Sequence, residues 1–321
     1  MNKKFWSFFI VIVLLCIVTV MSAVTGSIRM GIIEFLSAIW NGDSEKLVVI
    51  KDLRFPRIIV AIFAGAALSV SGVLLQAVMR NPLADAGVIG ISSGAGFVSI
   101  IIVTMFPSLF FWSPILAFAG GALACFLVFS LSWKSGLSPL KIILVGIAIN
   151  AMFTGLRDAF VTICSYIQVT VEGSMTSNLT MKTWNDVELI VLWGSIGLIL
   201  AALLFSWCNV LVLQDKTAKN LGMRVTQTRV VIAAVAVLLA AISTVVAGVI
   251  SFVGLLIPHI SRRLVGSDHK LLIPFSALAG ALLILTADTL GRTLIAPQEI
   301  PASTIMAIIG GPFLIFLLRK G

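Results

Sequence analysis

LRFPRIIVAIFAGAALSVSGVLLQAVM (residues 53–79) runs directly into RNPLADAGVIGISSGAG (residues 80–96), and this stretch decides the fold. The apolar run from Ile58 to Met79 matches the ~20 residues that a helix needs to cross the hydrocarbon core of a membrane. Arg54 and Arg57 precede the run, and Arg80 follows it. We therefore expect a membrane-spanning helix with a functional loop at each end.

Small residues interrupt the apolar run and allow neighbouring helices to approach closely, which predicts that this helix packs inside protein rather than against lipid. They are Gly65, Ala66, Ala67, Ser69, Ser71 and Gly72. Pro82 disfavours the helical conformation at Asn81, so the helix is expected to end there. Non-helical chain near membrane depth must line a cavity or be covered by protein, and we expect the same of residues 80–90.

Composition restricts the class of protein. Hydrophobic residues make up 60% of the 321 residues and charged residues only 11%, whereas soluble domains have about 25% charged residues. The apolar run at residues 5–22 lacks a cleavage site followed by a soluble domain, so we interpret it as a retained span. The four cysteines lie in or beside apolar runs without metal-ligand spacing and are interpreted as packing residues.

The chain is predicted to be an all-α, polytopic membrane protein with one membrane domain over residues 1–321. Apolar segments predict about ten spans, at residues 5–25, 58–79, 88–106, 113–133, 139–157, 187–208, 228–247, 249–265, 271–291 and 302–318. RIIVA at residue 57 and RVVIA at residue 229 begin spans of opposite direction, a weak sign of an inverted repeat over about residues 57–157 and 229–320.

The basic residues predict the orientation of the chain. An even number of spans places both termini on one face, and that face would carry 14 of the 22 basic residues against Asp85, Asp215 and Asp268, a net charge of 14 − 3 = +11. These basic residues are Lys3, Lys4, Arg80, Lys134, Lys141, Lys216, Lys219, Arg224, Arg229, Arg262, Arg263, Lys270, Arg319 and Lys320. The positive-inside rule makes this face cytoplasmic.

Few residues suit chemistry inside the membrane. The sequence has no phosphate-binding GxxxxGK[ST] motif, so ATP hydrolysis by that route is not expected here. His259 and His269 lack further ligands at suitable spacing, so we predict no metal site and interpret His259 as a structural or coupling residue. The ionisable residues inside the predicted spans are few: Arg157 beside Asp158, and Asp288 with Arg292, which are four residues apart and can pair on one helix face. This scarcity of charge argues against a proton-coupled carrier.

Several motifs together resemble the FecCD family of ABC permeases, which import iron-siderophore complexes, haem and cobalamin. The matching stretches are RFPR at residues 54–57, NPLADAGVIGISSGA at 81–95, GLLIPHISRRLVGSDH at 254–269, and IP at 300–301 followed by GGPF at 310–313. They occur in the family's order over nearly the whole chain. The resemblance implies a type II ABC importer permease in the cell membrane, without enzymatic activity or cofactor of its own.

The resemblance also implies partners and assigns residues to them. The permease would pair with a second copy or a close paralogue, with ABC ATPase subunits, and with an extracytoplasmic solute-binding protein. Ala218, Leu221 and Gly222, in the long inner loop at residues 213–229, would contact the ATPase. Arg54, Arg57 and Arg292 would dock carboxylates of the binding protein, because arginine forms two-pronged bonds with them; lipid anchoring is the simpler alternative.

The family's gate positions correspond to Asn81 and Leu83, and also to Ser138, where GLSP at residues 136–139 departs from the family pattern. The segment LTMKTWNDV, residues 179–187, resembles haem-uptake permeases of Gram-positive surface systems, which favours haem over a ferric siderophore. A cobalamin importer, a proton-coupled secondary transporter, and a membrane enzyme using His259 as acid or base are the alternatives.

Overall fold

The computed structural model describes residues 3–25, 51–133, 139–169, 171, 179–296 and 298–320, and in these ranges the secondary structure is entirely helical. Its elements are α1 (Lys3–Val24), α4 (Phe55–Met79), α5 (Ile91–Met105), η1 (Pro107–Trp112), α6 (Ser113–Trp133), α7 (Pro139–Tyr166), α8 (Trp184–Leu203), α9 (Phe205–Leu211), α10 (Asp215–Asn220), α11 (Val225–Ala247), α12 (Val253–Val265), α13 (His269–Thr293) and α14 (Ala302–Lys320). The all-α class predicted from the sequence is confirmed.

Seven described helices are long and apolar enough to cross a membrane. They contain α1, α4, α6, α7, α8, α11 and α13, while the apolar α5 and α14 are classed as shorter and α12 has 13 residues. The predicted count of ten spans is therefore not confirmed. Three boundaries differ most. The helix α7 continues nine residues beyond the predicted end at residue 157, and α8 ends at Leu203 instead of residue 208. The helix α12 begins at Val253 instead of residue 249, because residues 248–252 are not helical.

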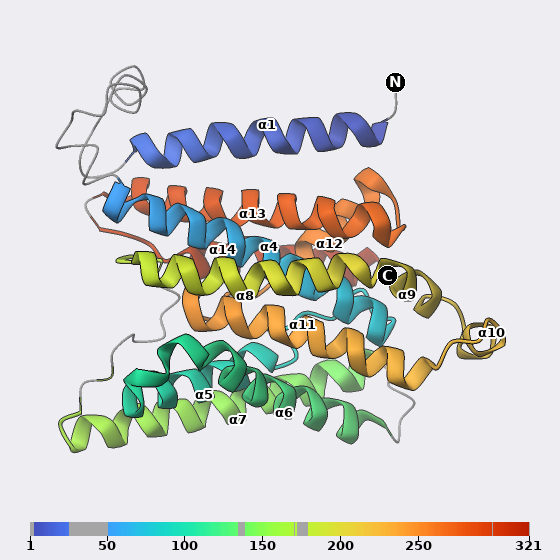
Figure 1. Ribbon diagram of the computed structural model, residues 1–321, viewed down its shortest axis with the longest axis horizontal. Coiled ribbons are helices and arrows are strands. Elements are labelled where there is room, and N and C mark those ends of the chain that lie inside the picture. Colours follow the sequence, from blue (N-terminus) through green and yellow to red (C-terminus); the bar gives the residue numbers. More distant parts are fainter. Residues whose placement is uncertain are drawn as a thin grey trace.

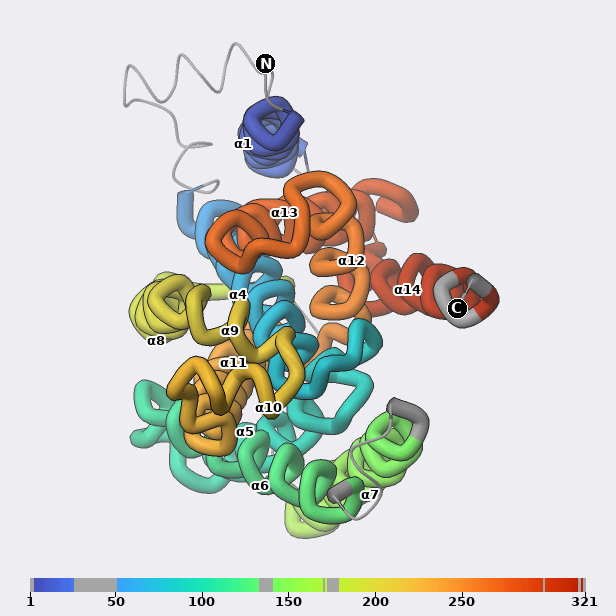
Figure 2. The backbone as a smooth tube through the Cα atoms, turned by 90° about the vertical axis from the view of Figure 1, so that its right-hand side faces the viewer, coloured from blue at the N-terminus to red at the C-terminus, as the bar shows by residue number. Residues whose placement is uncertain are grey.

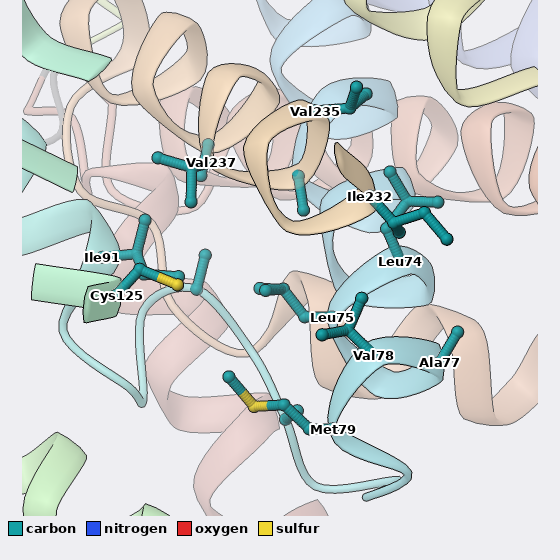
Figure 3. Packing of buried hydrophobic residues seen from close by; sticks show 14 of the residues in the cluster. Leu74, Leu75, Ala77, Val78, Met79, Ile91, Cys125, Ile232, Val235 and Val237 are labelled. Carbon is teal, nitrogen blue, oxygen red and sulfur yellow. The ribbon is translucent and has the colours of Figure 1, made fainter. Parts of the chain in front are cut away.

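The long helices lie side by side, with α4 in the interior (Figure 1). On one side of α4, α13 lies between it and most of α1; on the other, α11 separates it from α6. Nearly every residue of α4 from Ala64 to Met79 is buried, as the small-residue pattern predicted. Leu74, Leu75 and Val78 of α4 meet Ile232 and Val235 of α11 in a dense apolar core (Figure 3).

Glycines allow two helices to approach the backbone of α4. Gly72 lies against Gly254 of α12, and Gly65 lies against Gly280 of α13, in each case so closely that a Cβ atom would overlap the opposing backbone. Such contacts are typical of helix pairs in membranes, where packing replaces the hydrophobic effect as the driving force for association.

The ends of the bundle have distinct contents. The helix α10 projects from one end, and both the beginning of α1 and the end of α14 lie toward that same end (Figures 1 and 2). We call it the hairpin end. Arg57, Asp288 and Glu299 lie at the opposite end, which we call the arginine end.

The glycine contact between α4 and α12 provides a first prediction. Gly72→Ala should lower the thermal unfolding temperature of the purified protein, because the new methyl group forces the two backbones apart; overpacking of this kind costs about 1–3 kcal/mol. Gly155→Ala in α7 is the matched control, since a Cβ there meets nothing within 4 Å. Equal melting of the two variants would contradict the close α4–α12 packing.

Candidate functional site: two charged ends and a polar helix face

A buried ion pair joins α4 to α13 at the arginine end. Arg57 donates to both carboxylate oxygens of Asp288, with Nη2 2.8 Å from Oδ1 and Nε 3.0 Å from Oδ2. The Nη1 atom of Arg57 lies 2.8 Å from Oε2 of Glu299, which also accepts from Thr180. Asp288 is 2% exposed, so its charge depends on these partners rather than on water.

Two more arginines extend this cluster to α1. Arg54 donates to the carbonyl oxygen of Ala23 at 2.6 Å, and Arg292 donates to Ser22. Arg292 also pairs with Asp288 at 3.4 Å, so the predicted pairing along α13 is confirmed. The three arginines predicted to dock a binding protein are thus brought together, but their side chains are engaged below the surface, with each residue 7–8% exposed.

Glu299 is the accessible member of this arginine cluster. Its side chain is 37% exposed and borders a hollow of about 200 Å³ that Arg57 and Asp288 also line. Partial burial opposes ionisation of Glu299, but the hydrogen bond and charge of Arg57 outweigh it and hold the carboxyl pKa below its usual range. Glu299 is therefore a carboxylate at neutral pH.

The loop at residues 80–90 is covered by protein, as expected for irregular chain near membrane depth. Its buried Asp85 accepts from the backbone of Gly87 and Val88, and also from Phe252 and Gly254 at the start of α12. Asp85 therefore fixes the loop to α12.

The predicted gate residues lie at the start of this loop. Asn81 is 2% exposed, and its Oδ1 accepts from the backbone N–H of Leu83 at 2.9 Å, which fixes the turn after α4. Leu83 is half-buried. Ser138, the third predicted gate residue, lies outside the described residues.

The inner loop forms a compact hairpin around Gly222. Met223 N–H donates to the Ala218 carbonyl and Gly222 N–H to that of Lys219, the paired bonds of a Schellman motif. Gly222 has φ of +82°, a left-handed conformation that costs other residues about 1–2 kcal/mol. Asp215 secures the base of the hairpin by pairing with Arg80 and Arg229.

The three predicted coupling residues differ in exposure. Leu221 is 65% exposed and Gly222 has open space around its Cα, whereas Ala218 is fully buried. Leu221 and Gly222 border a hollow of about 480 Å³ with Arg224 and Trp207. Ala218 therefore supports the hairpin from within, and Leu221 presents the apolar contact surface.

The helix α7 carries a polar face of which the sequence analysis identified only Arg157 and its neighbour Asp158. Asn150, Thr154 and Arg157 recur at helical spacing and line one small hollow with Ser93 and Gly96 of α5. Arg157 pairs with the exposed Asp158 at 2.8 Å. Charged groups inside membrane helices are costly against lipid and usually face water or protein. The helical spacing of Asn150 and Arg157 was the pattern in the sequence that could have revealed this face.

Apolar helices around a fully buried central helix, with a charged cluster at each end and a polar face on one outer helix, define a membrane transport protein. The comparison with known sequences agrees, and the chain belongs to the FecCD transport family, which matches residues 13–320. The protein is therefore a multi-pass membrane permease of the ABC transporter class and not an enzyme.

Relatives resemble the chain over its whole length. It is 37% identical over 317 residues to Staphylococcus aureus IsdF of strain MSSA476, named "Probable heme-iron transport system permease protein", covering 99% of this chain and 96% of the relative. The IsdF of strain Newman gives the same identity and coverage. A solved structure, described as an inward-facing conformation of a metal-chelate type ABC transporter, matches with a TM-score of 0.78 and 29% identity, covering 99% and 100% of the two chains.

The buried ion pair provides a second prediction. Asp288→Asn should destabilise the protein by about 3–5 kcal/mol, because it leaves Arg57 and Arg292 buried without their shared carboxylate. Thermal unfolding in detergent measures the change. Asp158→Asn, which removes an exposed carboxylate beside Arg157, should have a much smaller effect. Equal effects of the two variants would contradict a structural role for the Asp288 pair.

A third prediction concerns pH. The pKa of Glu299 is lowered by folding, so its contribution to stability is fully present above its unfolded pKa of about 4.3 and is lost as pH falls through the lower folded pKa. The stability difference between the native protein and Glu299→Gln should be constant from pH 5 to 7 and should shrink below pH 5. A difference that grows on acidification would contradict the assigned direction.

Proposed function

We propose that the protein is the permease subunit of an ATP-driven ABC importer that carries an iron chelate into the cytoplasm. The observation that carries this proposal is full-length similarity to proteins whose names assign them to haem-iron transport, together with the match to a metal-chelate type transporter. We favour haem as the cargo, with a ferric siderophore as the second candidate. A cobalamin importer is the alternative within the same family.

The hairpin is proposed as the contact for an ATPase subunit. Leu221 supplies an exposed apolar tip, the Schellman motif at Gly222 holds it in one conformation, and Asp215 links its base to α4 and α11 through Arg80 and Arg229. A displacement of Leu221 at the tip would therefore be transmitted directly to α4 and α11. The buried Ala218 contributes by keeping the hairpin rigid.

The arginine cluster is proposed as the docking point for a solute-binding protein. Arg54, Arg57 and Arg292 are buried and already bonded to groups of this chain. A carboxylate of the binding protein can therefore bind an arginine only by replacing one of these partners. Glu299 is the group that can leave, since it is partly exposed and its partner Arg57 keeps Asp288. A carboxylate of the binding protein would then take the place of Glu299 on Arg57.

The polar face of α7 is proposed to line the translocation path against a second copy or a close paralogue. Asn150, Thr154 and Arg157 would be unfavourable against lipid, and a partner subunit would place them beside water or protein. The gate would be formed by the turn at Asn81 and Leu83, with Ser138 as a further candidate. Weak polar contacts suit a path that must release its cargo.

The orientation and internal symmetry are also proposals. The hairpin end carries α10, the beginning of α1 and the end of α14, so the positive-inside rule supports a cytoplasmic position for both termini. The helices α4 and α11 pack against each other and run from opposite ends of the bundle. Arg57 lies near the beginning of α4, and Arg229 lies near the beginning of α11. This supports an inverted repeat within the single membrane domain of residues 1–321.

Transport in proteoliposomes tests the proposed function. The permease reconstituted with its ATPase subunits and haem-loaded binding protein should accumulate haem only with ATP, and a ferric siderophore and cobalamin serve as competing cargoes. Haem uptake by the permease alone, driven by a proton gradient, would support a secondary carrier instead. ATP-dependent uptake of cobalamin but not haem would retain the permease class and overturn the cargo.

A coupling variant provides a fourth prediction. Gly222→Val should reduce ATP-driven uptake at least tenfold without preventing membrane insertion, because valine strongly disfavours the left-handed conformation that closes the hairpin. Gly311→Val in α14 is the control, since its Cβ also meets nothing within 4 Å. Normal uptake by Gly222→Val would overturn the assignment of the hairpin as the ATPase contact.

A further inference from the structure

A basic cavity lies at the hairpin end, away from the hairpin itself. It has a volume of about 460 Å³ and lies between the end of α4, residue 212 after α9, the last turns of α12 and the start of α13. Three arginines and both histidines of the chain line it, and its lining includes no carboxylate. Its composition is therefore that of a site for an anion.

The charges of two arginines in this cavity are not compensated. Arg80 pairs with Asp215 on the hairpin, whereas among the described residues the neutral side chain of Gln76 is the only hydrogen-bond partner of Arg262. Arg263 makes no ion pair or hydrogen bond with any residue in the described ranges. Two adjacent guanidinium groups thus face one cavity without a carboxylate among the residues that line it.

A basic rim by itself is the ordinary mark of a cytoplasmic membrane face. Two buried polar atoms distinguish this cavity from such a rim. Asn81 and His269 are each 2% exposed, and within the described chain both Nδ2 of Asn81 and Nε2 of His269 lack a hydrogen-bond partner. Buried polar groups in native proteins are normally satisfied, so these two atoms are available to bind a ligand at the cavity.

The neighbouring contacts define what that ligand must offer. Oδ1 of Asn81 already accepts from Leu83, which leaves Nδ2 as a donor. Nδ1 of His269 lies 2.7 Å from Oδ1 of Asn209, whose Nδ2 donates to Asp268; Nδ1 is therefore the protonated nitrogen, and Nε2 can accept. The ligand requires several acceptor oxygens, and one of them can carry a proton for Nε2.

We propose that this cavity binds a phosphate group, with Arg262 and Arg263 on its charged oxygens, Asn81 as an additional donor and His269 Nε2 accepting from a P–OH group or from bound water. Arginine forks match phosphate oxygens in geometry as well as charge. The phosphate can come from free inorganic phosphate or from the headgroup of an anionic phospholipid in the adjacent leaflet. Binding at this site would couple the phosphate or anionic lipid near the membrane to the turn that follows α4.

Binding to the purified full-length protein tests this proposal without any transport measurement. In one arm, inorganic phosphate is titrated by isothermal calorimetry against chloride at equal ionic strength. In the other, native mass spectrometry counts phosphatidylglycerol and phosphatidylcholine retained from mixed vesicles. Saturable phosphate binding identifies the free anion as the source, and selective retention of phosphatidylglycerol without phosphate binding identifies the headgroup. Either result supports the site only if it depends on the cavity arginines.

The variants make that dependence measurable. Arg262→Gln with Arg263→Gln should weaken binding about tenfold or more, since bonds to charged groups are lost. Arg263→Lys should have an intermediate effect because it keeps the charge but not the fork. Lys219→Gln removes one charge from the exposed surface of α10 and should leave binding unchanged.

Arg263→Gln alone replaces the double variant if that variant does not fold, because Arg263 has no ion pair or hydrogen bond to lose in the described residues. Its expected effect is a several-fold loss of binding. The proposal is overturned if the native protein binds neither probe, or if its binding is equal in the arginine variants and in Lys219→Gln.

Discussion

Burial of α4 from Ala64 to Met79 is the constraint from which the other features follow. A helix that contacts only protein must leave room for its neighbours, and Gly65 and Gly72 do so by meeting Gly280 and Gly254. Its polar side chains must also be satisfied by protein groups, because the membrane interior contains no water to replace them. Arg57 at one end therefore requires Asp288, and Gln76 near the other bonds to Gly254 and Arg262.

The two ends of α4 satisfy this requirement in different ways. At the arginine end, Arg57 pairs with Asp288 and Glu299, and Arg292 pairs with Asp288, so these charges compensate one another within the protein. At the hairpin end, Arg262 and Arg263 face a cavity without a carboxylate partner. The first arrangement can admit an acidic protein surface only by exchanging a partner, whereas the second can accept an anion directly. Both remain proposals, and both arise from one buried helix with polar residues near its ends.

The sequence predicted those features that depend on local pattern. Apolar length predicted the long helices, small-residue content predicted the burial of α4, and the four-residue spacing predicted the Asp288–Arg292 contact. Ion pairs between residues far apart in the chain left no such pattern in the sequence. Arg57 and Asp288 are 231 residues apart in the chain, and Glu299 becomes their neighbour only because residues 298–301 lie back against α13, where Ile300 N–H donates to the Gly291 carbonyl. The cavity around Arg262 likewise combines four separate segments, so spacing alone does not reveal it.

Site-specific labelling of the two ends tests most directly the claim that cargo arrives at the arginine end and ATP hydrolysis acts at the hairpin end. Leu221→Cys and Ile295→Cys, each exposed, are introduced separately after the four free cysteines are replaced by serine. A membrane-impermeant maleimide should label Ile295→Cys in intact cells and Leu221→Cys only after permeabilisation. Labelling of Leu221→Cys from outside, with Ile295→Cys protected until the membrane is opened, would contradict the account.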